Sequence, residues 1–475
     1  MRRALGLLAA AAAAASARRV RAFVPAPAGA EPDPGPVDAA AAAERLARLV
    51  RIPTISSRDP EQVDEAAFAR FREELAALYP RLHAALEREV LGTGALLYRW
   101  PSGSDAPPLV LMAHYDVVPV EGQDWRDDPF SGRIADGLVH GRGALDDKGS
   151  LVAVAEAVES LLAQGSVPRR DVYLSFGHDE EVFGAGAPLA VAALTARGVQ
   201  PWAVLDEGGA VVSGVFPGVD GPIAVVGLAE KGMLDLELTT TDAGGHASAP
   251  APGGATARLA RAVLRLDDDP FPARLDDVVL QMVDTVGRQA RGAHRALFAH
   301  AAALRPVLAR VLAGSSRQGN ALVRTTVAIT QLEGSPASNV LATRARANAN
   351  IRIALGETVT SAVEHVRRVV DDPSVVLRVV HGNDPSPVSR TDHEPWALVS
   401  RAVRAVYPDA TVTPYVMVQA SDARHFAQIS DSVYRFMPFD LSAEELATIH
   451  AADERLSIAA LGRGIGFYRA LITGA

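Results

Sequence analysis

The feature that most constrains the fold is a series of apolar, strand-like runs, each followed by a stretch with helical periodicity. Leu109–Ala113 precedes Ser150–Gln164, Val172–Phe176 precedes Pro188–Arg197, and Trp202–Leu205 follows. Strands that alternate with helices indicate an α/β domain with a mostly parallel central sheet. We therefore expect three layers, with helices on both faces of the sheet and ligands beyond the carboxyl ends of the strands.

The pattern changes after Lys231. The segment "MLDLELTTTDAGG" alternates like a half-exposed strand, and later stretches give further strand and helix signals: Ala255–Leu266 (helix), Leu275–Leu312 (Arg-rich helix), Ala321–Leu332 (strand), Ala345–Ile353 (strand) and Val359–Val370 (helix). This order predicts a smaller α+β lid domain inserted into the first domain. The expected organisation is a leader and linker at 1–36, the catalytic domain at 37–232 and 384–475, and the lid at 233–383.

The N-terminus has the features of an export signal. Two arginines precede an apolar run from Ala4 to Ala17, which ends in small residues and is shorter than the ~20 residues of a spanning helix. The sequence therefore favours export or membrane anchoring by this segment. A disordered, alanine-rich tail and a cytoplasmic location stay open as alternatives.

The net charge of -9 and the absence of a basic block argue against nucleic acid as a partner. The 0 cysteines exclude disulfides and thiolate metal sites, so any bound metal must use histidine and carboxylates.

Acidic and histidine residues gather after the strand-like runs. His114 and Asp116 follow the run Leu109–Ala113, and further clusters occur in "GRGALDDKGS", "GHDEEVFG", "VLDEGG" and "TIHAADERLS". Carboxylates that converge on one crevice repel one another unless cations compensate them. With no thiolates available, this set of residues indicates zinc, with cobalt or manganese as substitutes.

Six motifs in one consistent order resemble a known family. They are "AHYDVVP", "GRGALDDKG", "DEEVFG", "DEGG", "GGHASAP" and "IHAADERLS". They look like the dinuclear zinc peptidases that include carboxypeptidase S, carnosinases, aminoacylases and glutamate carboxypeptidase. The segments "EKG", "SPVS" and "SDARHF" are most similar to the carboxypeptidase S branch, which includes secreted N-fatty-acyl-amino-acid hydrolases.

The resemblance implies a role for each matching residue. Asp146 would bridge two divalent metal ions, and the other ligands would be His114 and Asp206 for one ion and Glu181 and His450 for the other. Glu180 would act as the catalytic base, and Asp116 would orient His114 by a hydrogen bond to its second ring nitrogen. Glu207 is interpreted as a loop carboxylate. The family also implies a cis peptide bond between Asp146 and Asp147.

The lid would supply substrate contacts. The resemblance implies that His246 stabilises the oxyanion, from a closed lid or from a partner subunit, and that Asn339 and Arg352 hold the carbonyl and carboxylate of the substrate. Arg424 would add a second cationic contact. The chain departs from the family after Asn339-Val340, where Leu-Ala stands in place of Ile-Pro, and at Ala423, where the branch commonly has serine.

These features lead to a functional hypothesis of a metal-dependent hydrolase that cleaves an amide bond next to a free carboxylate. The substrate would be a small peptide or an N-acyl amino acid, and the chain would form a homodimer through the lid domain. Two alternatives are an N-fatty-acyl-amino-acid hydrolase/synthase rather than a peptidase, and a non-catalytic metal-binding homologue of the same fold.

Overall fold

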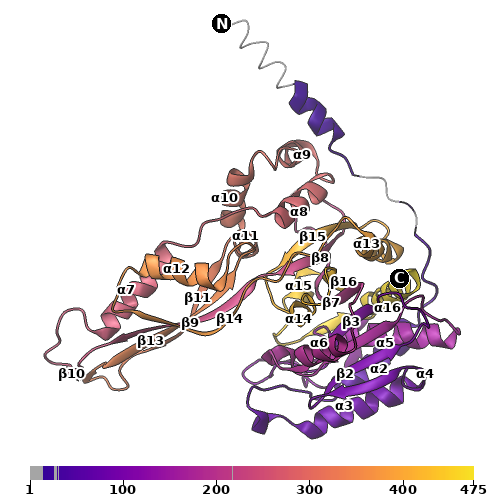
Figure 1. Ribbon diagram of the computed structural model, residues 1–475, viewed down its shortest axis with the longest axis horizontal. Coiled ribbons are helices and arrows are strands. Elements are labelled where there is room, and N and C mark those ends of the chain that lie inside the picture. The colour runs from indigo at the N-terminus through magenta and orange to yellow at the C-terminus, as the bar shows by residue number, and fades with distance from the viewer. Residues whose placement is uncertain (1–13, 26–28, 30, 217) are drawn as a thin grey trace, which may run out of the picture.

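The computed structural model describes residues 14–25, 29, 31–216 and 218–475, which form a main body and an elongated second domain (Figure 1). The apolar run Ala4–Ala17 lies largely outside the described residues, so export or anchoring stays a prediction. Among the described residues, no helix has both the length and the apolar character needed to cross a membrane.

The main body is built on an eight-stranded sheet of order β1-β2-β6-β3-β7-β16-β8-β15. The strands β6, β3, β7 and β16 run parallel, as do β8 and β15, whereas β1 and β2 continue the sheet antiparallel at one edge. The bounds are β1 Glu87–Leu91, β2 Ala95–Trp100, β3 Leu109–His114, β6 Val172–Gly177, β7 Ala203–Val212, β8 Ile223–Glu230, β15 Thr411–Met417 and β16 Val433–Asp440. The expected mostly parallel sheet is confirmed.

Helices cover both faces of this sheet, which gives the three expected layers. One face carries α2 (Ala39–Val50), α5 (Lys148–Ala163), α13 (Glu394–Val406) and α16 (Ile458–Gly474), with α3 (Glu65–Leu78) and α4 (Pro80–Ala85) beside them. The other face carries α6 (Gly186–Ala196) and α14 (Ala423–Phe426). Along β3, Leu109 and Leu111 belong to the core under the first group, while Val110 and Met112 belong to the second core. A strand buried on both faces explains the continuous apolar run in the sequence.

The second domain contains a four-stranded antiparallel sheet of order β11-β13-β9-β14. Its elements are β9 Gly232–Thr241, α7 Ala255–Asp268, β11 Thr326–Glu333, β13 Arg344–Ile353, α12 Val359–Val370 and β14 Val376–Asn383. Buried and half-exposed residues alternate along β13, because one face of the sheet packs against α7 and α12. At its far end, a short ladder joins β10 (Gly245–His246) to β12 (Val340–Leu341).

The Arg-rich stretch within 233–383 lies outside this lid sheet. It forms α8 (Asp277–Gly287), α9 (Gly292–Phe298), α10 (Arg305–Ser315) and α11 (Arg317–Val323), and α8 packs against β15 of the main sheet. The strand expected over Ala321–Leu332 is therefore partly wrong, because residues up to Val323 belong to α11 and β11 begins at Thr326.

A small three-stranded sheet joins distant parts of the chain. Its order is β17-β5-β4, with β4 at Arg133–Ala135, β5 at Leu138–His140 and β17 at Arg455–Ser457. The short helix α15 (Ala443–Leu446) precedes β17. The chain also forms two short 3₁₀ turns, η1 (Pro60–Gln62) before α3 and η2 (Glu180–Val182) after β6. The pairing of β17 with β5 brings the C-terminal motif "IHAADERLS" next to the loop that carries Asp146.

Candidate metal centre

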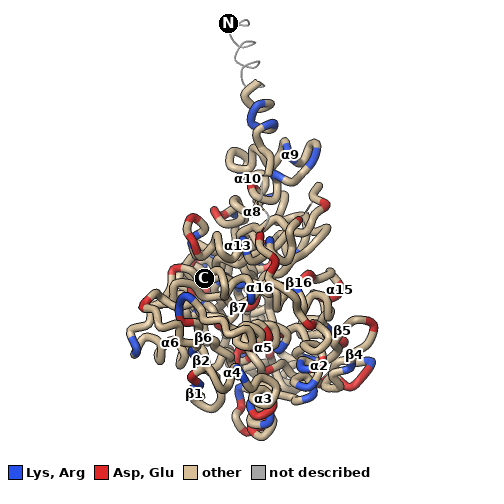
Figure 2. Tube along the Cα trace, turned by 90° about the vertical axis from the view of Figure 1, so that its right-hand side faces the viewer, with Lys and Arg blue, Asp and Glu red and all other residues tan. Residues whose placement is uncertain are grey.

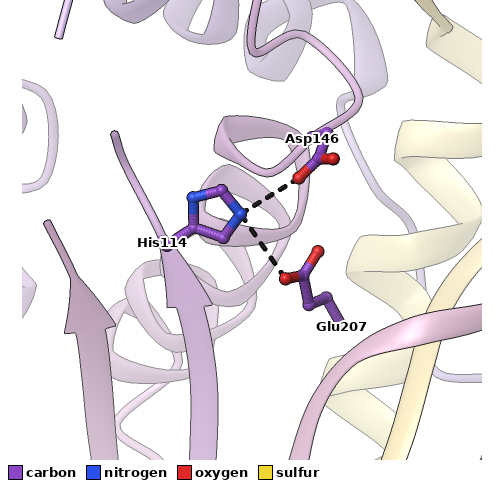
Figure 3. Close-up of side chains that lie close together, drawn as sticks. All are labelled: His114, Asp146 and Glu207. Carbon is purple, nitrogen blue, oxygen red and sulfur yellow. Dashed lines mark hydrogen bonds and ion pairs between the residues drawn. The ribbon is translucent and has the colours of Figure 1, made fainter. Parts of the chain in front are cut away.

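The first group of potential ligands forms where β3 ends. His114 is the last residue of β3, and its Nε2 lies 3.0 Å from Oδ1 of Asp146 and 3.5 Å from Oε1 of Glu207 (Figure 3). His114 comes from β3, Asp146 from the loop before α5, and Glu207 from β7. Their ligand atoms all lie within 4.8 Å of one another, so one ion could contact all three.

A second group shares Asp146 with the first. The Nε2 atom of His450 lies 3.2 Å from Oδ2 of Asp146 and 3.0 Å from Oε2 of Glu181. Asp146 therefore presents one carboxylate oxygen to each group. A bridging carboxylate of this kind suits two ions about 3.5–4 Å apart.

Asp116 holds these groups in place from behind. Its Oδ1 lies 3.2 Å from Nδ1 of His114, on the side of the ring opposite the ligand atom Nε2. Its two carboxylate oxygens also accept hydrogen bonds from the backbone N–H groups of Glu180 and Glu181, at 3.2 and 3.1 Å, and from the hydroxyl of Ser56 at 2.7 Å. One buried carboxylate thus orients both the imidazole and the turn that carries Glu180.

The electrostatics of the centre fit bound cations. Burial and the charge of Asp146 raise the pKa of Glu207, and burial and the charge of Glu207 raise the pKa of Glu180. Burial lowers the pKa of His114, but the neighbouring carboxylates outweigh it and hold that pKa well above the ordinary value. Within the described part of the chain, no lysine or arginine lies within ion-pair distance of Asp146, Glu181 or Glu207. A set of histidines and unneutralised carboxylates is the donor set that divalent metal ions prefer.

The family model described as "Peptidase family M20/M25/M40" matches residues 110–474 of the chain. The chain belongs to this peptidase family. Its members are metallopeptidases and related amidohydrolases, so this M20 chain is a metal-dependent hydrolase by family, and the expected resemblance is confirmed.

Two curated relatives have names that describe different substrates. "Probable carboxypeptidase S-like 2" of Dictyostelium discoideum is 35% identical over 411 residues, covering 85% of this chain and 79% of the relative. "N-fatty-acyl-amino acid synthase/hydrolase PM20D1" of Xenopus tropicalis is 36% identical over 413 residues, covering 86% and 80%.

Solved structures confirm the M20 fold. A metallo-carboxypeptidase from Sulfolobus solfataricus, Sso-CP2, superposes with a TM-score of 0.68 at 16% identity, covering 91% of this chain and 98% of that one. Human carnosine dipeptidase 1 gives a TM-score of 0.63 at 16% identity, covering 92% and 96%.

The structure differs from the predicted ligand set at one position. It brings Glu207 to His114 and Asp146, and it does not bring Asp206 there. The two residues are consecutive on β7, so their side chains point to opposite sides of the strand. Asp206 is buried and accepts a hydrogen bond from the backbone N–H of Ala423 at 2.8 Å. The interpretation of Glu207 as a loop carboxylate is therefore wrong for this structure.

The remaining residues of the main body lie near the centre. Glu180 is buried beside Glu181, and the peptide bond between Asp146 and Asp147 is cis, as the resemblance implies. Arg424 lies with its guanidinium 5.1 Å from the ring centre of Phe183, which directly follows the turn Glu180–Val182. Arg424 is thus positioned beside the turn that carries Glu180.

The predicted substrate residues of the lid are spread along its length. His246 pairs with Val340 at the far end, next to Asn339, and both His246 and Asn339 are exposed. Arg352 lies at the other end of β13, where it pairs with Met233 next to the main body. The eight residue-to-residue steps from Arg344 to Arg352 span about 27 Å of strand. The structure therefore does not bring His246 and Asn339 together with Arg352.

Sequence reasoning missed Glu454, which supports Asp146, the residue shared by the two groups. Its Oε1 accepts hydrogen bonds from the backbone N–H groups of Leu145 and Asp146, at 2.9 and 3.0 Å, and its Oε2 pairs with Arg142 at 2.7 Å. Both members of this ion pair are buried. The sequence feature that could have identified Glu454 is its place in the motif "IHAADERLS", four residues after His450.

Proposed function

We propose that this chain hydrolyses an amide bond next to a free carboxylate, in a small peptide or an N-acyl amino acid. The observation that carries the proposal is Asp146, whose two oxygens face two separate histidine–carboxylate groups, with Glu180 buried beside them. The proposed ligands are His114, Asp146 and Glu207 for one divalent ion and Asp146, Glu181 and His450 for the other. Zn²⁺ suits this donor set, with Co²⁺ or Mn²⁺ as substitutes.

The chain's own residues supply the proton transfers. When bound, two such ions lower the pKa of a shared water and polarise the scissile carbonyl. Glu180 accepts a proton from the attacking water, whose oxygen bonds to the carbonyl carbon. As the C–N bond breaks, Glu180 gives that proton to the leaving nitrogen. Asp116 keeps Nε2 of His114 directed at the ligand position by holding Nδ1.

The substrate carboxylate would bind to arginine. Arg352 and Arg424 lie on the two sides of the junction between lid and main body, and a guanidinium fork binds a carboxylate through two parallel hydrogen bonds. His246 would donate a hydrogen bond to the carbonyl oxygen as negative charge develops there. Because His246 and Asn339 lie at the far end of the lid, they require lid closure or a second copy of the chain.

A homodimer through the lid would account for this distance. The edge strand β14 exposes three valines, Val376, Val379 and Val380, together with unpaired backbone groups. An edge strand with apolar side chains is a surface on which a second chain can pair. We therefore propose that two copies associate along the lid.

A substrate panel and a chelator test the hydrolysis. We expect the metal-loaded protein to release the amino acid from one or more of N-acetyl-amino acids, N-fatty-acyl-amino acids and dipeptides, and chelation to abolish turnover. Glu180→Gln should retain metal while turnover falls by about 10²–10⁴-fold. The exposed Glu61→Gln serves as the matched control and should behave as wild type. Full turnover by metal-stripped protein would contradict the mechanism, and the preferred acyl group would decide between the activities named for the two relatives.

A mixing experiment tests the position of His246. The variants His246→Ala and Glu180→Gln should each be nearly inactive alone. If His246 acts on the partner's site, a dissociated and reassociated mixture regains about a quarter of wild-type activity, because half of the dimers then contain one complete site. No recovery in a mixture shown to contain heterodimers would mean that His246 acts through closure of its own lid.

A further inference from the structure

The stretch from 285 to 332 has an unusual charge for this chain. It contains no aspartate or glutamate, although the whole chain has a net charge of -9. Its arginines are spread over several helices rather than gathered in one block: Arg288, Arg291, Arg295, Arg305, Arg310, Arg317 and Arg324. This stretch is therefore a positively charged region within an otherwise acidic chain.

The helix α10 in this stretch turns an apolar face outward. Val307 and Val311 are 49% and 57% exposed, and Arg310 is exposed between them, while Leu308 and Ala309 are buried on the opposite side. These positions recur at the helical spacing of three to four residues, so they form one face. The nearby helix α9 adds Leu297, which is 37% exposed.

Part of the positive charge on this surface is not neutralised by the protein. Among the described residues, no carboxylate lies within ion-pair distance of Arg310 or Arg317. Three other arginines of the stretch do have acidic neighbours: Arg288 with Asp284, Arg291 with Asp220 and Arg305 with Asp277. Exposed pairs of this kind contribute little and exchange readily for other anions.

The N-terminal helix lies against the same surface. Residues 14–22 are helical, and the Ser16 hydroxyl lies 2.9 Å from Nε2 of His300, while Arg19 donates to the carbonyl of Ala299. Arg288 lies 4.9 Å from the ring centre of Phe23. Figure 2 shows this end of the molecule, where the N-terminal helix, α9 and α10 carry blue segments. The apolar run Ala4–Ala17 of the sequence therefore ends beside the Arg-rich helices.

We propose that the surface formed by residues 14–22, α9 and α10 docks on a lipid bilayer that contains anionic headgroups. Exposed valine and leucine side chains would enter the headgroup boundary, and the surrounding arginines would contact phosphates. The apolar face distinguishes this surface from one that binds a soluble polyanion, which would need only the charge. Docking here does not depend on the hydrolytic reaction, since none of these residues belongs to the proposed metal centre.

Vesicle co-sedimentation of the full chain tests the proposal. The probes are vesicles of phosphatidylcholine alone and vesicles of phosphatidylcholine mixed with phosphatidylglycerol. The test variant is Arg310→Glu with Val311→Asp. The matched control is Val167→Asp with Arg169→Glu, which makes the same change of charge at an exposed valine and arginine in the loop after α5. All three proteins share the same N-terminus, and thermal unfolding checks that all three are folded.

We expect wild type and control to bind the anionic vesicles, less tightly as salt increases, and to bind phosphatidylcholine weakly. One arginine near an anionic surface strengthens binding about fivefold. Reversing the charge of Arg310 removes one such contribution and adds an equal repulsion, so it should weaken binding about thirtyfold. The proposal is overturned if all three proteins bind alike, if the two kinds of vesicle are bound equally, or if none of the proteins binds. Retention on heparin without binding to vesicles would overturn it in favour of a soluble polyanion.

Discussion

Replacing Glu454 by glutamine separates the charge of this residue from its shape. Glu454 is fully buried, pairs with the buried Arg142, and accepts hydrogen bonds from the backbone N–H groups of Leu145 and Asp146. Glutamine keeps the oxygen that can accept these two hydrogen bonds and removes the negative charge. The variant therefore measures how much the stability of the fold and the metal affinity of the centre depend on the ion pair itself.

The structure allows the size of the effect to be worked out. Arg142 is 1% exposed, and a buried charge that loses its partner costs about 3–5 kcal/mol. Arg142 retains a hydrogen bond of 2.8 Å to Oε1 of Gln123, and its guanidinium lies 5.2 Å from the ring centre of Trp125, so we expect the lower end, about 3 kcal/mol. Glu454→Leu also removes the acceptor of the backbone N–H groups of Leu145 and Asp146, and each buried N–H left unsatisfied adds about 1–3 kcal/mol.

Urea unfolding in the presence of a chelator measures this stability without a contribution from bound metal. A separate metal titration should show affinity about 10–100-fold weaker in Glu454→Gln, because the ion pair with Arg142 no longer anchors the side chain that holds the loop of Asp146. Glu444→Gln, a highly exposed position ten residues earlier, is the control. A variant within about 0.5 kcal/mol of wild type, with unchanged metal affinity, would refute the reasoning.

Three further predictions concern the centre and the lid junction. Asp116→Asn should reduce metal affinity about 10–100-fold, as measured by titration, because an amide cannot hold His114 as the carboxylate does; unchanged affinity would contradict this. Glu207→Gln should lower the metal content per chain whereas Asp206→Asn should not, and metal analysis showing the reverse would restore the ligand set predicted from the sequence. Burial lowers the pKa of Lys231 to about 8 from 10.5, so the unfolded chain binds more protons between these pH values and wild-type stability rises with pH there. Relative to Lys231→Met, the gain over this interval should reach up to about 3 kcal/mol in denaturant unfolding, and parallel pH profiles would count against it.

The sequence predicts the core of the fold well because burial on both faces leaves a clear pattern. The apolar runs at Leu109–Ala113 and Val172–Phe176 correspond to β3 and β6. The strand β1 at Glu87–Leu91 leaves no such pattern, since it lies at the sheet edge and four of its five residues are exposed. Its sequence "EREVL" therefore reads equally well as the end of a helix.

The motifs predict most residues of the candidate site, and they fail at one pair of adjacent acids on a strand. His114, Asp146, Glu181 and His450 lie in the two groups as the motifs predict, although Asp146 and Glu181 each have an acidic neighbour, Asp147 and Glu180. Asp206 and Glu207 are adjacent acids on one strand, and the choice between them depends on which side of β7 faces the crevice. That orientation is set by the packing of the whole sheet, so a motif cannot supply it.

The lid shows a second limit of sequence reasoning. The motifs predict that His246 and Arg352 act in one reaction, but the strand β13 separates their two ends of the lid by about 27 Å. A motif predicts which residues act together, but it does not show whether those residues come from one copy of the chain or from two. The distance can be bridged only by motion or by assembly, so quaternary structure becomes part of the catalytic question.

Both proposed metal groups depend on contacts between segments remote in sequence. His450 lies more than 300 residues after Asp146, and the pairing of β17 with β5 together with Glu454 brings them together. The same arrangement gathers Asp146, Glu181 and Glu207 where no arginine or lysine of the described chain neutralises them. The fold therefore brings together carboxylates that repel one another, and cations relieve that repulsion. We therefore expect metal binding and the pairing of β17 with β5 to be thermodynamically coupled, since each favours the arrangement that the other requires.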